Sequence, residues 1–145
     1  MYDFVILVHY LLSSIFFIVA LIMITWAIIG WAQGKQYKPA FKRLSFFFTL
    51  FLYLELLTGI FLYIYLKYEI HTSGMSLEQA VRQSNIKFWV IEHVSLMLFA
   101  LLLSQIGMLF IKQITSDRKK FRAATFYFGI SFIVVLISGI MALFR

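Results

Sequence analysis

Four long apolar stretches dominate the chain, at approximately 4–31, 44–66, 88–111 and 123–143. Each is about 20 residues long or longer, which is the length that an α-helix needs to cross the hydrocarbon core of a bilayer. Short polar connections separate the stretches, so few residues remain for any other element. The pattern predicts one all-α domain over residues 1–145, an integral membrane four-helix bundle whose successive helices run up, down, up and down.

The composition agrees with a lipid environment. Hydrophobic residues make up 63% of the chain and charged residues only 13%, whereas soluble domains are roughly half apolar and a quarter charged. The first residues, Met1-Tyr2-Asp3, lack the basic region of a secretory signal, so we expect the first span to be retained. There is no cysteine, which excludes disulfides and thiolate metal sites, so a redox role would need another cofactor.

The net charge of +7 would suggest a nucleic-acid partner if the basic residues formed one surface. Nine of the thirteen instead lie in or beside the two connections at 32–43 and 112–122. These nine are Lys35, Lys38, Lys42, Arg43, Lys112, Arg118, Lys119, Lys120 and Arg122. Because cytoplasmic connections are enriched in lysine and arginine, we expect both connections to be cytoplasmic, both termini to be outside, and no nucleic acid to bind.

The connection at 67–87 is the one sizeable segment between spans. Within it, Ser76 and Gln79 have the spacing of a capping box, which predicts a short surface helix over about 77–85. Two roles are open for this helix. It either lies on the membrane and joins two spans, or acts as a lid or partner-docking element, as some long loops do.

A short internal repeat is visible in the second and fourth spans. Residues 56–60 read LLTGI and residues 136–140 read LISGI, and each follows a span with one histidine near its start. Two-span units keep the same orientation, so the copies would be related by an axis along the membrane normal. His9 and His93 would then be symmetry mates. The match is short and apolar, so coincidence explains it as well as descent does.

Four ionisable residues lie within the predicted spans: His9, Glu55, Glu92 and His93. Such residues are costly in a membrane and are functional-site hypotheses by default. Both histidines lie about 8 Å from the outer face at 1.5 Å per residue, and Glu55 lies roughly 16 Å deep.

The histidines belong to the first and third spans, which are diagonal in an up-down-up-down bundle. Two opposed neutral imidazoles at one depth suit the two axial positions of an iron porphyrin, which predicts heme b with His9 and His93 as ligands. Three cations near the outer face are candidate partners for the propionates: Lys67, Arg82 and Lys87. Alternatively, each histidine simply hydrogen-bonds a neighbouring span.

The two carboxyl groups have different expected roles. Glu92 and His93 diverge by about 100° on a helix and cannot easily share a metal, so Glu92 suits a hydrogen bond to another helix or to a ligand. Glu55 is either a neutral packing residue or a proton carrier. Three side chains offer partners for the packing role: Tyr53, Ser104 and Gln105.

Motifs in all four spans carry a resemblance to a known family. They are His9 near the start of the first span, residues 55–59 (ELLTG) followed by Leu62-Tyr63, Glu92-His93 with Leu96-Met97, and Lys120-Phe121-Arg122. The chain resembles a family of small four-span bacterial inner-membrane proteins that are often labelled cytochrome b-like. The resemblance implies heme and a location in the bacterial inner membrane. The outer side, where the basic residues lead us to expect the termini, would then be the periplasm.

One position departs from that family. Many members carry a further histidine in the second span, two positions before a glutamine that matches Glu55, and Tyr53 stands there in this chain. A site built from three histidines would be incomplete here, whereas a heme held by His9 and His93 would survive.

The leading hypothesis is a b-type heme protein that carries electrons near the outer face, alone or as the heme-bearing subunit of a redox complex, with a quinone or other subunits as partners. The alternative is a non-catalytic accessory subunit whose polar residues fix helix packing. A transporter is disfavoured because no span is interrupted by proline or by paired glycines, as transporter helices often are.

Overall fold

The computed structural model describes residues 2–144, and within this range the chain forms helices and turns with no strand. The long helices are α1 (Tyr2–Gln33), α2 (Pro39–Thr72) and α6 (Asp117–Leu143). The remaining span is continuous through α4 (Ser84–Lys87), the π-helix η1 (Phe88–Glu92) and α5 (His93–Gln113). All four segments are long and apolar enough to cross a membrane. The predicted fold class, an all-α membrane bundle of four helices, is confirmed.

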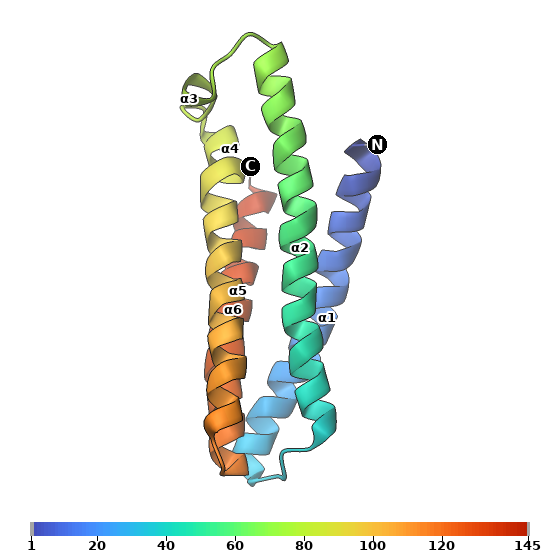
Figure 1. The fold of residues 1–145 in the computed structure, drawn as a ribbon, viewed down its shortest axis with the longest axis vertical. Coiled ribbons are helices and arrows are strands. Elements are labelled where there is room, and N and C mark those ends of the chain that lie inside the picture. The colour runs from blue at the N-terminus through green and yellow to red at the C-terminus, as the bar shows by residue number, and fades with distance from the viewer. Residues whose placement is uncertain (1, 145) are drawn as a thin grey trace.

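The helices pack in the cyclic order α1, α2, α5 and α6. Successive helices run in opposite directions, and both chain ends lie at the same end of the bundle (Figure 1). Helices α1 and α5 are therefore diagonal to each other, as the topology predicts, and α2 and α5 share the smallest of the four neighbouring interfaces. The two short basic connections lie together at the opposite end (Figure 1).

The segment between the second and third spans differs from its prediction. Helix α2 continues to Thr72 and rises well above the N-terminus, so Lys67 lies on a helix rather than in a loop (Figure 1). Ser76 and Gln79 form both bonds of the capping box, but the helix α3 (Leu77–Ala80) is shorter than the expected 77–85. It ends early because residues 81–83 close into turns, and residues 84–87 already belong to the next span.

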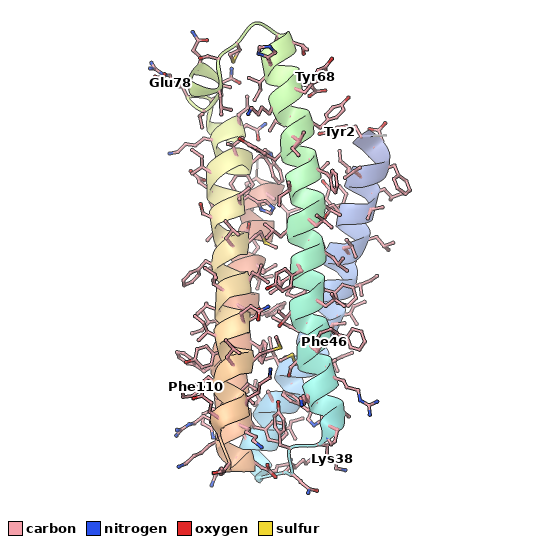
Figure 2. The ribbon with its side chains drawn as sticks, viewed as in Figure 1. Tyr2, Lys38, Phe46, Tyr68, Glu78 and Phe110 are labelled. Atoms are coloured by element: carbon pink, nitrogen blue, oxygen red, sulfur yellow. The ribbon has the colours of Figure 1, made fainter. Side chains whose placement is uncertain are left out.

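Buried aromatic rings fill much of the bundle core. Phe41 and Phe121 are fully buried at the end with the basic connections, where their ring centres lie 5.0 Å apart. Phe48 links the next layer, 4.9 Å from Phe16 and 5.1 Å from Phe128. Other aromatic side chains, such as Phe46 and Phe110, point away from the bundle (Figure 2).

Two glycines let helix α6 approach its neighbours closely. A Cβ on Gly30 of α1 would lie 2.7 Å from the ring of Phe121, and a Cβ on Gly107 of α5 would lie 2.6 Å from the Cβ of Tyr127. Both distances are far below an ordinary carbon contact, so neither position has room for a side chain. Small residues commonly bring membrane helices together in this way.

Candidate functional site

The candidate site begins with His9, whose ring reaches from α1 to α2. Its Nδ1 lies 2.9 Å from the hydroxyl of Thr58 and 2.9 Å from Oε2 of Glu55. The Thr58 hydroxyl itself donates to the backbone carbonyls of its own helix. When the hydroxyl donates to one of these carbonyls, its oxygen accepts from Nδ1 of His9. A neutral imidazole with its proton on Nδ1 has its lone pair on Nε2.

His93 makes the corresponding contact on the other side of the bundle. Its Nδ1 lies 2.7 Å from the hydroxyl of Ser138 on α6. The ring also packs against two aromatic residues, with centre-to-centre distances of 5.8 Å to Phe88 and 5.3 Å to Trp89. His93 is thus fixed on one side by a hydrogen bond and on another by apolar rings.

The π-helix η1 ends immediately before His93, and the sequence gives no sign of it. The backbone N–H of His93 donates to the carbonyl of Phe88, five residues earlier. A π-turn contains one more residue than an α-turn, so the side chains that follow it are rotated about the helix axis. Single π-turns of this kind occur frequently at functional sites.

The two histidine rings face the same region of the core. Their centres lie 6.4 Å apart, and their planes are inclined at 79°. Within residues 2–144, no hydrogen bond occupies Nε2 of either ring. The bundle therefore brings two imidazoles together from diagonal helices, each held through Nδ1.

The internal repeat has a structural counterpart. Thr58 and Ser138 occupy the same place in the segments 56–60 and 136–140. Thr58 bonds the histidine of α1 in the first pair of spans, and Ser138 bonds the histidine of α5 in the second. Each two-span unit thus supplies one histidine and one supporting hydroxyl.

Glu55 breaks this symmetry. It is only 3% exposed, and the position that matches it in the repeat is the apolar Val135. Its Oε2 contacts His9, while its Oε1 has no hydrogen-bond partner among the described residues. A carboxyl group therefore supports one of the two histidines and not the other.

The three partners that the sequence offered for Glu55 are wrong. Tyr53 and Gln105 bond each other, with Nε2 of Gln105 donating to the tyrosine oxygen at 2.6 Å. The Ser104 hydroxyl donates to the carbonyl of Leu101. Glu55 turns instead toward α1, because the histidine of that helix lies at its own depth.

A small cavity of about 120 Å³ adjoins the site between α2 and the helix that carries His93. Glu55, His93 and Tyr63 are its polar wall residues, and its other walls are apolar. A water molecule takes about 30 Å³ in the liquid, so the cavity has room for a few waters. It is smaller than the roughly 300–1,000 Å³ of pockets that hold small organic ligands.

The cations expected around the site are engaged elsewhere or exposed. Lys87 lies 3.6 Å from Glu92 in the same helical segment, and Arg82 lies 3.3 Å from Glu78. Lys67 is exposed on α2. The expected bond from Glu92 to another helix is replaced by the Lys87 contact, because a π-turn places residues five apart over each other.

The two imidazoles are the candidate metal ligands that the structure brings together. Within residues 2–144 there is no cluster of three or more histidine and carboxylate side chains able to hold a metal ion. Two imidazoles on opposite sides of one metal have ring centres roughly 6 Å apart, given bonds of about 2 Å and about 1 Å from each nitrogen to its ring centre. The observed 6.4 Å is close to that spacing, whereas the adjoining cavity of about 120 Å³ is smaller than a porphyrin.

The hydrogen bonds at Nδ1 of each ring resemble those of metal-binding histidines. Metal-binding histidines almost always donate their other N–H to a carboxylate, carbonyl or water, which fixes the ring and increases its basicity. Glu55 and Thr58 are placed to do this for His9, and Ser138 contacts the equivalent nitrogen of His93.

Comparison with known proteins returned no match: no protein-family model, no curated protein and no solved structure is similar to this chain. The cytochrome b-like resemblance therefore remains a prediction from the sequence motifs.

Proposed function

We propose that this protein binds heme b between His9 and His93 and carries electrons in the membrane, alone or as the heme-bearing subunit of a larger redox complex. One observation carries the proposal. Two imidazoles from diagonal helices lie at the spacing of an axial pair, each fixed through Nδ1, with Nε2 free of hydrogen bonds within residues 2–144.

Each residue then has a definite part. The Nε2 atoms of His9 and His93 would supply the axial ligands, and heme iron supplies one-electron chemistry when it is bound. Glu55 and Thr58 hold the first imidazole and increase its basicity, while Ser138 holds the second. Lys87 lies six residues and about 9 Å earlier on the helix of His93 at 1.5 Å per residue, and it would have to exchange its contact with Glu92 for a propionate.

Heme binding would require the bundle to open. A porphyrin is larger than the cavity of about 120 Å³, so α2 and α5 must separate around Glu55 and His93 when heme binds. These two helices share the smallest interface between neighbouring helices. Gly59 lines the cavity and has no atom within 4 Å of the place of a Cβ, so this wall is already open.

We further propose that the protein lies in a bacterial inner membrane with its termini in the periplasm. Nine of the thirteen basic residues belong to the end of the bundle opposite the termini, and cytoplasmic ends are enriched in such residues. The heme would then lie near the periplasmic face. A quinone or another membrane subunit is the expected electron partner.

A second candidate is a non-catalytic accessory subunit in which the same residues only hold the helices together. The hydrogen bonds favour it directly, because each histidine bonds the next span, as polar residues in membrane bundles commonly do. The small size of the cavity favours it as well.

Substitution of the proposed heme ligands distinguishes a heme protein from an accessory subunit. His9→Ala and His93→Ala should each abolish b-type absorbance in the purified protein. His71 is exposed in the last turn of α2, so the control variant His71→Ala should keep this absorbance. Helical content measured by circular dichroism establishes that each variant is folded. Heme absorbance that persists in both span variants would refute the ligand assignment.

A further inference from the structure

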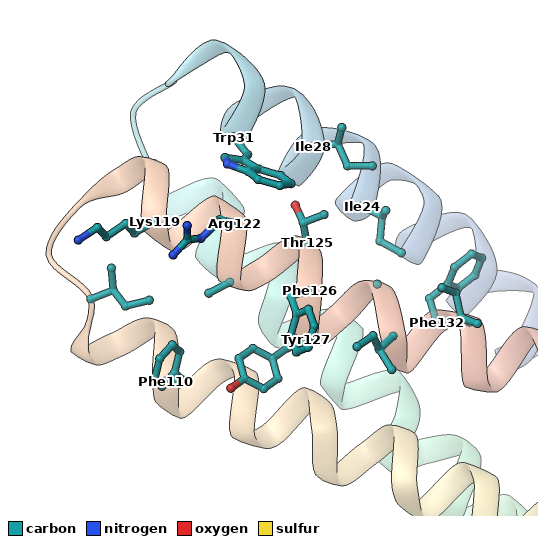
Figure 3. Close-up of a pocket in the computed structure, with 15 residues that line it drawn as sticks. Ile24, Ile28, Trp31, Phe110, Lys119, Arg122, Thr125, Phe126, Tyr127 and Phe132 are labelled. Carbon is teal, nitrogen blue, oxygen red and sulfur yellow. The ribbon is translucent and has the colours of Figure 1, made fainter.

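A long groove lies on the outside of α6, at the end of the bundle with the basic connections. Its volume is about 880 Å³, within the range of ligand pockets. Its walls come from α1 on one side and from the end of α5 on the other, with α6 as the floor (Figure 3). This groove is separate from the histidine site.

The groove is apolar along its length and cationic at one end. Ile24, Ile28 and Trp31 line its α1 side, and Phe132 and Ile133 mark its inner end on α6. Lys119 and Arg122 lie together at the end nearest the connection between α5 and α6 (Figure 3). Both side chains are exposed, and neither forms a salt bridge with another described residue.

The length of the groove matches one leaflet of a bilayer. Arg122 and Ile133 are eleven residues apart on α6, which is about 16 Å at 1.5 Å per residue. Half of the hydrocarbon core is about 15 Å thick. A chain that enters at Arg122 and follows α6 therefore ends near the middle of the membrane.

We propose that this groove is a specific site for an anionic phospholipid, with one acyl chain along α6 and the phosphate headgroup at Lys119 and Arg122. Charge complementarity selects this occupant over an uncharged lipid, because two cations lie at one end of an apolar groove and no acidic residue lines it. Basic pockets at the ends of membrane helices recognise anionic headgroups in this way. The site does not depend on the heme proposal.

Native mass spectrometry of the full-length protein in detergent tests the site, with added phosphatidylglycerol or zwitterionic phosphatidylcholine. Each cation near the membrane surface contributes about fivefold to anionic lipid binding, so the double variant Lys119→Gln/Arg122→Gln should bind phosphatidylglycerol roughly 25-fold more weakly. Lys42→Gln/Arg43→Gln is the matched control, because these two exposed cations lie at the same end of the bundle and do not line the groove.

A second variant tests the acyl-chain part. Gly129 lines the groove, and a Cβ there would meet nothing within 4 Å, so Gly129→Leu should occupy groove volume and weaken phosphatidylglycerol binding. Equal binding of the two lipids by the wild type would overturn the proposal. So would an equal loss in the control pair. If Gly129→Leu weakens phosphatidylglycerol binding and Lys119→Gln/Arg122→Gln does not, the groove holds an uncharged occupant, such as a quinone. That result would also contradict the proposal.

Discussion

The close contact between α5 and α6 at Gly107 makes a quantitative prediction about stability. In Gly107→Ala, the new Cβ would lie 2.6 Å from the Cβ of Tyr127, whereas carbon atoms normally pack about 3.5–4.0 Å apart. The Tyr127 Cβ is fixed to its backbone, so the helix itself must move by about 1 Å. Overpacking of this kind costs about 1–3 kcal/mol. Replacing a helical glycine by alanine stabilises the helix by roughly 0.5–1 kcal/mol. The net destabilisation of Gly107→Ala is therefore about 0–2.5 kcal/mol.

Unfolding of the purified protein in mixed micelles, followed by circular dichroism as the denaturing detergent increases, measures this loss. Gly129→Ala is the matched control, since a Cβ at that position meets no atom within 4 Å. It should raise the free energy of unfolding by about 0.5–1 kcal/mol through helix propensity alone. The packing argument is refuted if Gly107→Ala is as stable as Gly129→Ala.

Three further predictions concern orientation and the polar core. A reporter active only in the periplasm should give signal when fused at the C-terminus or after position 74 and none after positions 36 or 117; signal from position 36 would overturn the topology. Glu55→Gln keeps an acceptor and gains a donor, so the free energy of unfolding and the heme spectrum should change little, and a large loss of turnover in a normally assembled complex would instead identify a proton-carrying carboxyl. Ser138→Ala removes the one hydrogen bond that Nδ1 of His93 makes within residues 2–144, so heme affinity should fall about 10–100-fold; unchanged affinity in a heme titration would show that Ser138 does not support a ligand.

The number and approximate position of the spans could be predicted because lipid requires long apolar stretches. The polar end of α2 could not, since residues such as Lys67 and Glu69 look like a loop although they continue a helix. Relative depth could not be predicted either. Counting from the expected span ends puts Glu55 roughly 8 Å deeper than His9, but α2 rises above the start of α1, so the two helix ends do not lie at one level (Figure 1). The structure puts the two side chains in direct contact.

The proximity of the two histidines could be predicted, but their hydrogen-bond partners could not. Histidines near the starts of the first and third spans pointed to a pair at one depth, and their rings do lie 6.4 Å apart. The repeat suggested the pairing, but it did not reveal that Thr58 and Ser138 bond the histidines. The π-turn before His93 leaves no compositional signal, because it changes the hydrogen-bond register rather than the type of residue. Partners across helices depend on rotation about each helix axis, which apolar periodicity fixes only loosely.

The central claim is that His9 and His93 hold a heme, and an optical spectrum of the wild-type protein tests it most directly. The protein should be purified in mild detergent from cells supplied with heme, and its spectrum recorded oxidised and then reduced. The account predicts the reduced bands of a b-type cytochrome with about one heme per chain. A folded, helical protein that shows no heme absorbance in either state would contradict it and would identify the histidine pair as part of a packing core.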